Sequence, residues 1–132
     1  MVSSDSCKVL VAINDNHTAD VLATAIWNMR FTAYRAASAS SILLHLDAFP
    51  ETAIIFISMD FAFEENSKVL NKIRDKGLKM PVILFSQYVT VETLRLAGLY
   101  GCNEIIQYPV DPSTFIAIIN KYIPESQTYG VK

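Results

Sequence analysis

The sequence predicts a doubly wound α/β fold, in which helices cover both faces of a parallel sheet. Residues 53–57 read Ala-Ile-Ile-Phe-Ile, an apolar run rich in β-branched residues, which is typical of a strand buried on both faces. Apolar runs of strand length also alternate with segments of helical periodicity along the whole chain. This alternation indicates a parallel sheet with right-handed crossovers rather than a β-sandwich or a helix bundle.

The first half of the chain supplies two strand–helix units before the central strand. Polar residues at 14–16 suit a turn and a helix N-cap, and the residue before Pro50 is disfavoured in a helix. Apolar spacing and alternation define the elements between these points. The predicted elements are strands at 8–13, 31–36 and about 52–57, and helices at about 17–30 and 38–46.

The second half continues the same alternation. Gly77 and Gly101 are placed to end two helices, and Pro81 is tolerated at the first position of a strand. Asp111 or Ser113 can cap the last helix. The predicted elements are helices at 64–76, 90–100 and about 111–123, and strands at 81–85 and 103–107.

Length and composition indicate one globular domain. The 132 residues are 52% hydrophobic and 18% charged, enough for one core and too short for two. We expect a single domain over 1–132, with its core at about 7–123 and a polar tail at 124–132. Cys7 and Cys102 lack metal-type spacing, so we expect a reducing, cytoplasmic location.

Charge and hydropathy exclude several classes of partner. The formal net charge of −2, without any basic run, argues against nucleic acid and membrane surfaces. No apolar stretch reaches the length of a membrane span, and the first residues carry no signal-peptide pattern. A dinucleotide or flavin domain is disfavoured because no Gly-rich loop follows the first strand.

These units resemble the receiver domain of bacterial response regulators, including the chemotaxis-type single-domain form. The resemblance covers roughly residues 7–123. It rests on the order and spacing of Lys-Val-Leu-Val at 8–11, the central strand, Lys-Ile-Arg at 72–74, Met-Pro-Val-Ile-Leu-Phe-Ser at 80–86, Gly-Cys at 101–102 and Tyr-Pro at 108–109. It implies a five-stranded sheet of order 2-1-3-4-5 with five helices.

The resemblance also locates a phosphorylation site whose residue types have changed. A working receiver holds Mg²⁺ with an acidic pair after the first strand and phosphorylates an Asp after the third, and a hydroxyl and a lysine contact the phosphoryl group. The corresponding positions here are Ile13, Asn14, Ser58, Ser86 and Tyr108. Only Ser86 agrees with the pattern, so the chain resembles a pseudo-receiver without phosphoryl chemistry, a catalytic residue or a cofactor.

Two alternative registers remain open. A one-residue slip would make Asn14 and Asp15 the acidic pair. A two-residue slip keeps the buried face of the strand and would make Asp60 a displaced acceptor. Asp15 and Asp60 would then hold Mg²⁺.

Other positions bear on signalling and binding. The aromatic switch of the family falls on Ile105, which has no ring hydroxyl, and Tyr108 is expected to cover the emptied pocket and to precede a cis proline. His17 and His45 are expected at the surface.

An apolar surface is predicted over the last two helices and the last strand. Phe115, Ile119 and Tyr122 form the expected buried face of the last helix, which leaves Ile116, Ala117 and Ile118 facing outward. The resemblance implies that this face serves dimers and partner docking. The expected interface residues are Leu96, Leu99, Tyr100, Ile105, Ile116 and Ile118.

The sequence thus favours a non-enzymatic domain that signals through protein–protein contact, as a homodimer or docked on a partner. The first alternative is a residual Mg²⁺-dependent phospho-acceptor that uses Asp15 and Asp60. The second is a small-molecule sensor whose neutral ligand occupies the pocket around Asn14, Ser58, Ser86 and Tyr108.

Overall fold

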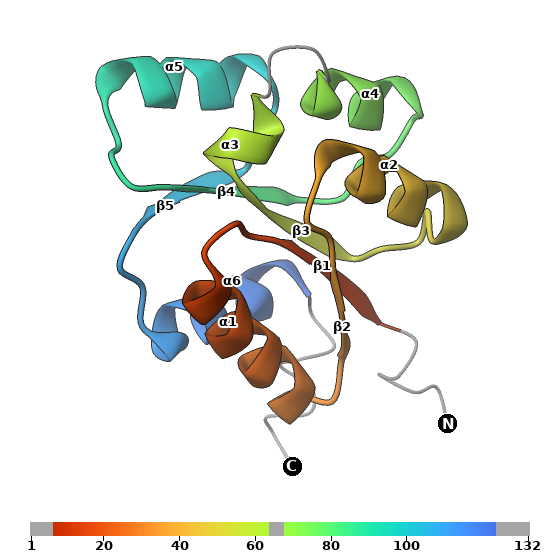
Figure 1. Ribbon diagram of the computed structural model, residues 1–132, viewed down its shortest axis with the longest axis vertical. Coiled ribbons are helices and arrows are strands. Elements are labelled where there is room, and N and C mark those ends of the chain that lie inside the picture. The colour runs from red at the N-terminus through yellow and green to blue at the C-terminus, as the bar shows by residue number, and fades with distance from the viewer. Residues whose placement is uncertain (1–6, 64–67, 124–132) are drawn as a thin grey trace.

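The computed structural model describes residues 7–63 and 68–123 and places five parallel strands in one sheet (Figure 1). The strand order is β2-β1-β3-β4-β5, so the expected 2-1-3-4-5 sheet is confirmed. The strands are β1 (Lys8–Ala12), β2 (Thr32–Arg35), β3 (Ile54–Ser58), β4 (Val82–Ser86) and β5 (Glu104–Gln107). Every residue of β3 and β4 is buried, as expected for central strands covered on both faces.

Helices form a layer on each face of the sheet (Figure 1). Helices α1 (Asn16–Asn28) and α6 (Pro112–Tyr122) cover one face. The other face carries α2 (Ala39–Ala48), α3 (Met59–Ala62), α4 (Val69–Asp75) and α5 (Val91–Leu99). A hydrophobic core therefore lies on each side of the sheet. No helix within 7–63 and 68–123 is long and apolar enough to cross a bilayer.

The helix ends follow local sequence signals. Asp15 caps α1 by accepting from the Thr18 N–H, and Ser38 and Thr90 begin α2 and α5 with capping boxes. Gly77 and Gly101 follow α4 and α5 with φ of +80° and +76°, a conformation that glycine adopts without steric cost.

The helices differ from prediction in three places. The described ranges contain six helices rather than five, because the chain makes one short helical turn, α3, directly after β3. Helix α2 reaches Ala48 rather than 46, since Pro50 restricts only Phe49 before it. The described part of the predicted 64–76 helix is α4, and its predicted start at 64 lies outside the described residues.

The sheet register brings the strand ends to one edge. Ala12 pairs with Ile57, Ser58 with Phe85, and Ser86 with Gln107. Side chains that follow β1, β3, β4 and β5 therefore meet at the carboxyl edge, where ligand sites of open parallel sheets are found.

Candidate functional site

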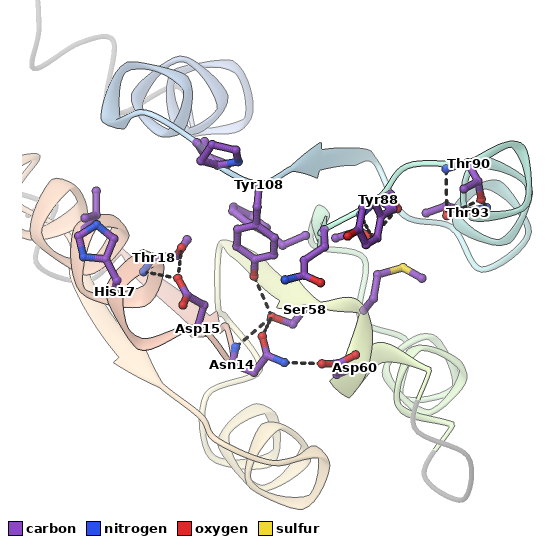
Figure 2. Close-up of a pocket in the computed structure, with 17 residues that line it drawn as sticks. Asn14, Asp15, His17, Thr18, Ser58, Asp60, Tyr88, Thr90, Thr93 and Tyr108 are labelled. Carbon is purple, nitrogen blue, oxygen red and sulfur yellow. Dashed lines mark hydrogen bonds between the residues drawn. The ribbon is translucent and has the colours of Figure 1, made fainter.

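A pocket of about 720 Å³ opens at this carboxyl edge (Figure 2). Its lining includes Asn14, Ser58, Ser86 and Tyr108, four of the five site positions predicted from the sequence. The fifth, Ile13, is 5% exposed and packs into the core between α1, α6 and the sheet. The structure therefore brings the predicted polar positions together and places Ile13 beneath them.

Ser58 is the centre of a neutral hydrogen-bond network. The residue is 1% exposed. Its Oγ accepts from the Asn14 backbone N–H at 3.0 Å. The same Oγ donates to Asn14 Oδ1 at 3.1 Å and lies 3.3 Å from Tyr108 Oη. A hydroxyl carries one proton, and this one goes to Asn14. Tyr108 must therefore be the donor in its bond with Ser58.

Tyr108 projects over the pocket from the end of β5 (Figure 2). Its ring packs against Phe85, with 5.7 Å between ring centroids. Burial raises the pKa of Tyr108 above that of an ordinary phenol, the hydrogen-bond contact with Ser58 opposes this, and the carboxylates of Asp15 and Asp60 add to the increase. The phenol thus stays protonated at neutral pH. The Tyr108-Pro109 bond is cis, as predicted.

Ser86 is turned toward its own loop. Its hydroxyl donates to the Tyr88 carbonyl at 2.7 Å and accepts from the Tyr88 N–H at 3.2 Å. This local turn uses the proton of the hydroxyl, although Ser86 lines the pocket. Ile105, the switch position, is half-buried against the core on the α5 side of the sheet.

Asp15 and Asp60 also line the pocket. Asp15 accepts from both the N–H (2.9 Å) and the hydroxyl of Thr18, and the Thr18 side-chain bond is the main reason that the pKa of Asp15 is lowered. Asp60, on α3, accepts from the Asn14 side-chain amide. Figure 2 shows the two carboxylates on either side of Asn14 and Ser58 in that view.

The fit of Mg²⁺ to these residues is poor. Magnesium requires near-octahedral oxygen ligands, and residues 7–63 and 68–123 contain no group of three His, Cys, Asp or Glu side chains that could hold a metal ion. The receiver pattern has carboxylates at positions filled here by neutral Ile13, Asn14 and Ser58. The two nearby carboxylates already accept hydrogen bonds from protein groups.

Exposed apolar side chains gather on α5 and the loop before it. We call Tyr88, Val91, Leu94 and Leu99 the α5 patch; they are 73%, 84%, 56% and 65% exposed. The described chain has seven exposed large hydrophobic residues, and four of them belong to this segment. Of these four residues, only Leu99 belongs to the interface predicted from the sequence. Tyr88, Val91 and Leu94 were not assigned to any surface.

The predicted contribution of α6 to this surface is corrected. Ile118 is buried at 7% exposure in the core with Phe115 and Ile119, because the buried arc of α6 is wider than predicted. Ile116 is exposed at 38%. However, it does not face β5. Lys121 marks the side of α6 that faces β5, because it donates to Glu104. Ile116 lies five residues before Lys121, which places it about 140° away around the helix axis. Leu96, Tyr100 and Ile105 are half-buried.

His17 is exposed, as predicted, but His45 is not a simple surface residue. Its ring packs against Tyr34 and Phe49, with centroid distances of 5.0 Å and 5.1 Å, and these two rings also stack on each other at 5.1 Å. Its Nε2 is 3.1 Å from Thr52 Oγ1, which donates its own proton to the Phe49 carbonyl. His45 is therefore the donor to Thr52.

Comparison with known proteins relates the chain to others through its fold. No protein-family model matches the chain, and no curated protein matches it. Solved structures do match. A CheY-like receiver domain protein of Methanospirillum hungatei JF-1 aligns with a TM-score of 0.77 at 18% identity, over 93% of this chain and 98% of that one.

Two further structures extend this result. Chemotaxis protein CheY4 of Vibrio cholerae aligns with a TM-score of 0.78 at 12% identity, over 89% of this chain and 98% of that one. NtrX of Brucella abortus aligns with a TM-score of 0.75 at 18% identity, over 92% of this chain but only 27% of NtrX. At these identities the likeness shows that the chain has the receiver fold.

Proposed function

We propose that this receiver-fold domain acts through protein–protein contact, independently of phosphorylation. The observation that carries the proposal is the bonding of Ser58 to Asn14 and Tyr108 at the place where a receiver carries its acceptor Asp. The network joins the uncharged hydroxyls of Ser58 and Tyr108 to the Asn14 amide, which also donates to Asp60. It gives the site a structural role in place of a reactive one.

The chemistry of these groups supports the loss of phosphoryl transfer. A serine hydroxyl needs an adjacent base to act as a nucleophile, and the proton of Ser58 is donated to an amide oxygen, which is not a base. Tyr108 occupies the position of the lysine that would contact a phosphoryl group. Its phenol is protonated and neutral, so it supplies no positive charge there.

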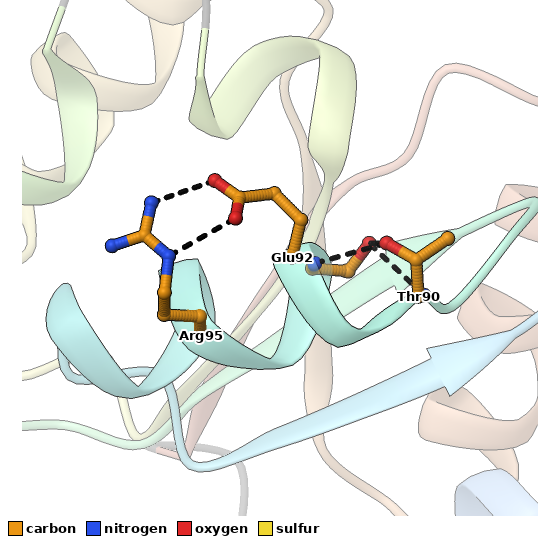
Figure 3. A network of polar contacts seen from close by, with 4 residues as sticks. Thr90, Glu92 and Arg95 are labelled. Carbon is orange, nitrogen blue, oxygen red and sulfur yellow. Dashed lines mark hydrogen bonds and ion pairs between the residues drawn. The ribbon is translucent and has the colours of Figure 1, made fainter.

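The α5 patch is the surface proposed for contact, and a second copy of the chain is the proposed occupant. Apolar side chains at this exposure mark interaction surfaces. Glu92 and Arg95 stand among them and form an ion pair within the helix (Figure 3). In a two-fold dimer, each residue would meet its opposite charge on the partner copy, so this surface is self-complementary.

Incubation with acetyl phosphate and Mg²⁺ tests the first half of the proposal. Intact mass spectrometry should show no gain of a phosphate group, while an ordinary receiver treated in parallel is phosphorylated. A gain that disappears in Asp60→Asn would contradict the proposal. It would support the alternative in which Asp60 is a displaced acceptor.

Sedimentation equilibrium tests the second half. We expect the wild-type chain to dimerise and Leu94→Glu to be monomeric. Leu44→Glu is the matched control, because Leu44 is also an exposed leucine, at 68%, but lies on α2. A monomeric wild-type chain, or equal loss of the dimer in both variants, would contradict the α5 patch as a dimer interface.

A further inference from the structure

We propose that the pocket at the carboxyl edge binds a small organic cation that carries an amine and an aromatic ring. This inference rests on the proposed function in one respect, since a site that transfers phosphate would require the opposite charge preference. It goes beyond that function by assigning a ligand class to the pocket.

The size and walls of the pocket suit such a ligand. Its volume of about 720 Å³ falls within the range of about 300–1,000 Å³ typical of small-molecule sites. Tyr88 and Tyr108 contribute aromatic rings to its lining, and the fully buried ring of Phe85 supports that of Tyr108. A ring can stack on these walls, and a cation is attracted to their faces.

The charge of the lining favours a cation. Asp15 and Asp60 are among the residues that line the pocket, and no Lys or Arg is. The lysine position of the receiver pattern is filled by Tyr108. A phosphate or carboxylate ligand would therefore enter against two negative charges without a Lys or Arg side chain to offset them, although His17 also lines the pocket.

The directions of the hydrogen bonds favour the same ligand class. The Tyr108 hydroxyl donates its proton to Ser58, and the Ser58 hydroxyl donates its own to Asn14. What Tyr108 can still offer a ligand is an acceptor lone pair. The bonds described for Asp15 and Asp60 within this part of the chain use Oδ2 of each, and carboxylates only accept. A protonated amine, with three donors, complements these acceptors.

Three phenols of one shape provide the test. Tyramine is cationic, 4-ethylphenol is neutral and 4-hydroxyphenylacetate is anionic at pH 7. Titration of the ¹⁵N-labelled chain should shift the amides of Asn14, Ser58 and Tyr108 with tyramine. Affinity should fall in the order tyramine, 4-ethylphenol, 4-hydroxyphenylacetate.

Charge-neutralising variants locate the effect. Asp60→Asn should weaken tyramine binding by about two- to fivefold, the range expected for a solvent-accessible charge pair, and leave 4-ethylphenol binding unchanged. Asp47→Asn is the matched control, because Asp47 lies on α2 and pairs with Lys76 away from the pocket. It should not change the affinity for either phenol.

Several outcomes would overturn the inference. These are absence of binding by tyramine, equal or tighter binding of 4-hydroxyphenylacetate, shifts confined to residues outside the pocket, or displacement of tyramine by an equal concentration of Mg²⁺. The acetyl phosphate assay tests the proposed function separately from the ligand inference. Failure of tyramine to bind would leave a negative acetyl phosphate result intact, whereas phosphorylation of Asp60 would remove the proposed function itself.

Discussion

Ser58 and Tyr108 join the ends of β3 and β5 at the pocket through two uncharged hydroxyls. Fifty positions separate them in the chain, and the resemblance to receivers assigns both to places that carry charged groups in that family. A carboxylate at 58 and an ammonium at 108 would attract one another, and the ammonium would also attract a phosphoryl ligand. Two hydroxyls joined by one hydrogen bond retain the contact between β3 and β5 without either charge.

Tyr108→Phe tests the energetic value of this contact. The substitution removes the donor to Ser58 but keeps the ring against Phe85, so we expect the free energy of unfolding to fall by about 0.5–1.5 kcal/mol. Urea denaturation measures the change. Tyr88→Phe, on an exposed ring, is the control and should be neutral. An equal decrease in both variants would show that the hydrogen bond between Tyr108 and Ser58 does not contribute to the free energy of unfolding.

His45 makes stability depend on pH. Burial lowers the pKa of His45 below its ordinary value, the negative charge of Glu51 partly opposes this, and the positive charge of Lys8 lowers the pKa further. The unfolded state therefore binds the proton more readily than the folded state. The free energy of unfolding should decrease as the pH falls below about 6.5, the value in an unfolded chain.

Urea denaturation between pH 5 and 7.5 measures this dependence. His45→Phe keeps a ring in contact with Tyr34 and Phe49 and should flatten the decrease at acid pH. His17→Phe, at an exposed position of α1, should retain the wild-type slope. A slope that persists in the His45 variant would assign the acid sensitivity to other groups.

Helix α6 shows how the environment of an element decides which of its residues are buried. Its sequence is apolar at Phe115, Ile116, Ile118 and Ile119, so periodicity alone permits more than one buried face. Packing against α1 and the sheet selects a face that includes Ile118. By contrast, α5 has a narrow buried face, since only Thr93 and Ala97 of its residues are buried.

Paired substitutions on α6 test this assignment. Ile118→Ala should lower the free energy of unfolding by about 2–4 kcal/mol, because it leaves a cavity in a packed core. Ile116→Ala removes the same atoms from a side chain that is 38% exposed and should cost under about 1 kcal/mol. Thermal and urea denaturation give both values. A larger effect at Ile116 than at Ile118 would contradict the assignment of Ile118 to the buried face of α6.

Arg74 connects segments that are distant in the fold. Its guanidinium donates to the carbonyls of Leu78 and Met80 at 3.0 Å and to that of Gly101 at 3.1 Å. These bonds tie the end of α4 to the entry of β4 and to the turn after α5. They lie at the opposite edge of the sheet from the pocket, so they serve the stability of the domain and not its site.

Arg74→Met should lower the free energy of unfolding by about 1.5–3 kcal/mol, the range for hydrogen bonds to a charged group. Arg35→Met is the control. Arg35 of β2 forms an exposed ion pair with Asp20 of α1, and such pairs contribute little, so no measurable change is expected. Comparable losses in the two variants would contradict the bridging role of Arg74.

The sequence by itself determined the order of strands and helices and the positions of the site residues. Both depend on local signals: the buried run of β3, the caps at Asp15, Ser38 and Thr90, and the spacing that brings residue 58 to a strand end. The sheet then has one edge at which such positions meet, so their proximity was predictable.

Tertiary structure decided the contacts that those residues make. These contacts depend on groups far along the chain or on competing local bonds. They are the direction of the bond between Tyr108 and Ser58, the turn of Ser86 toward Tyr88, the burial of Ile118 and the packing of His45 against two rings. Periodicity encodes which residues are apolar, but only packing selects which of several apolar faces is buried. Equally, a hydroxyl's role is fixed by its available partners, and the fold supplies these.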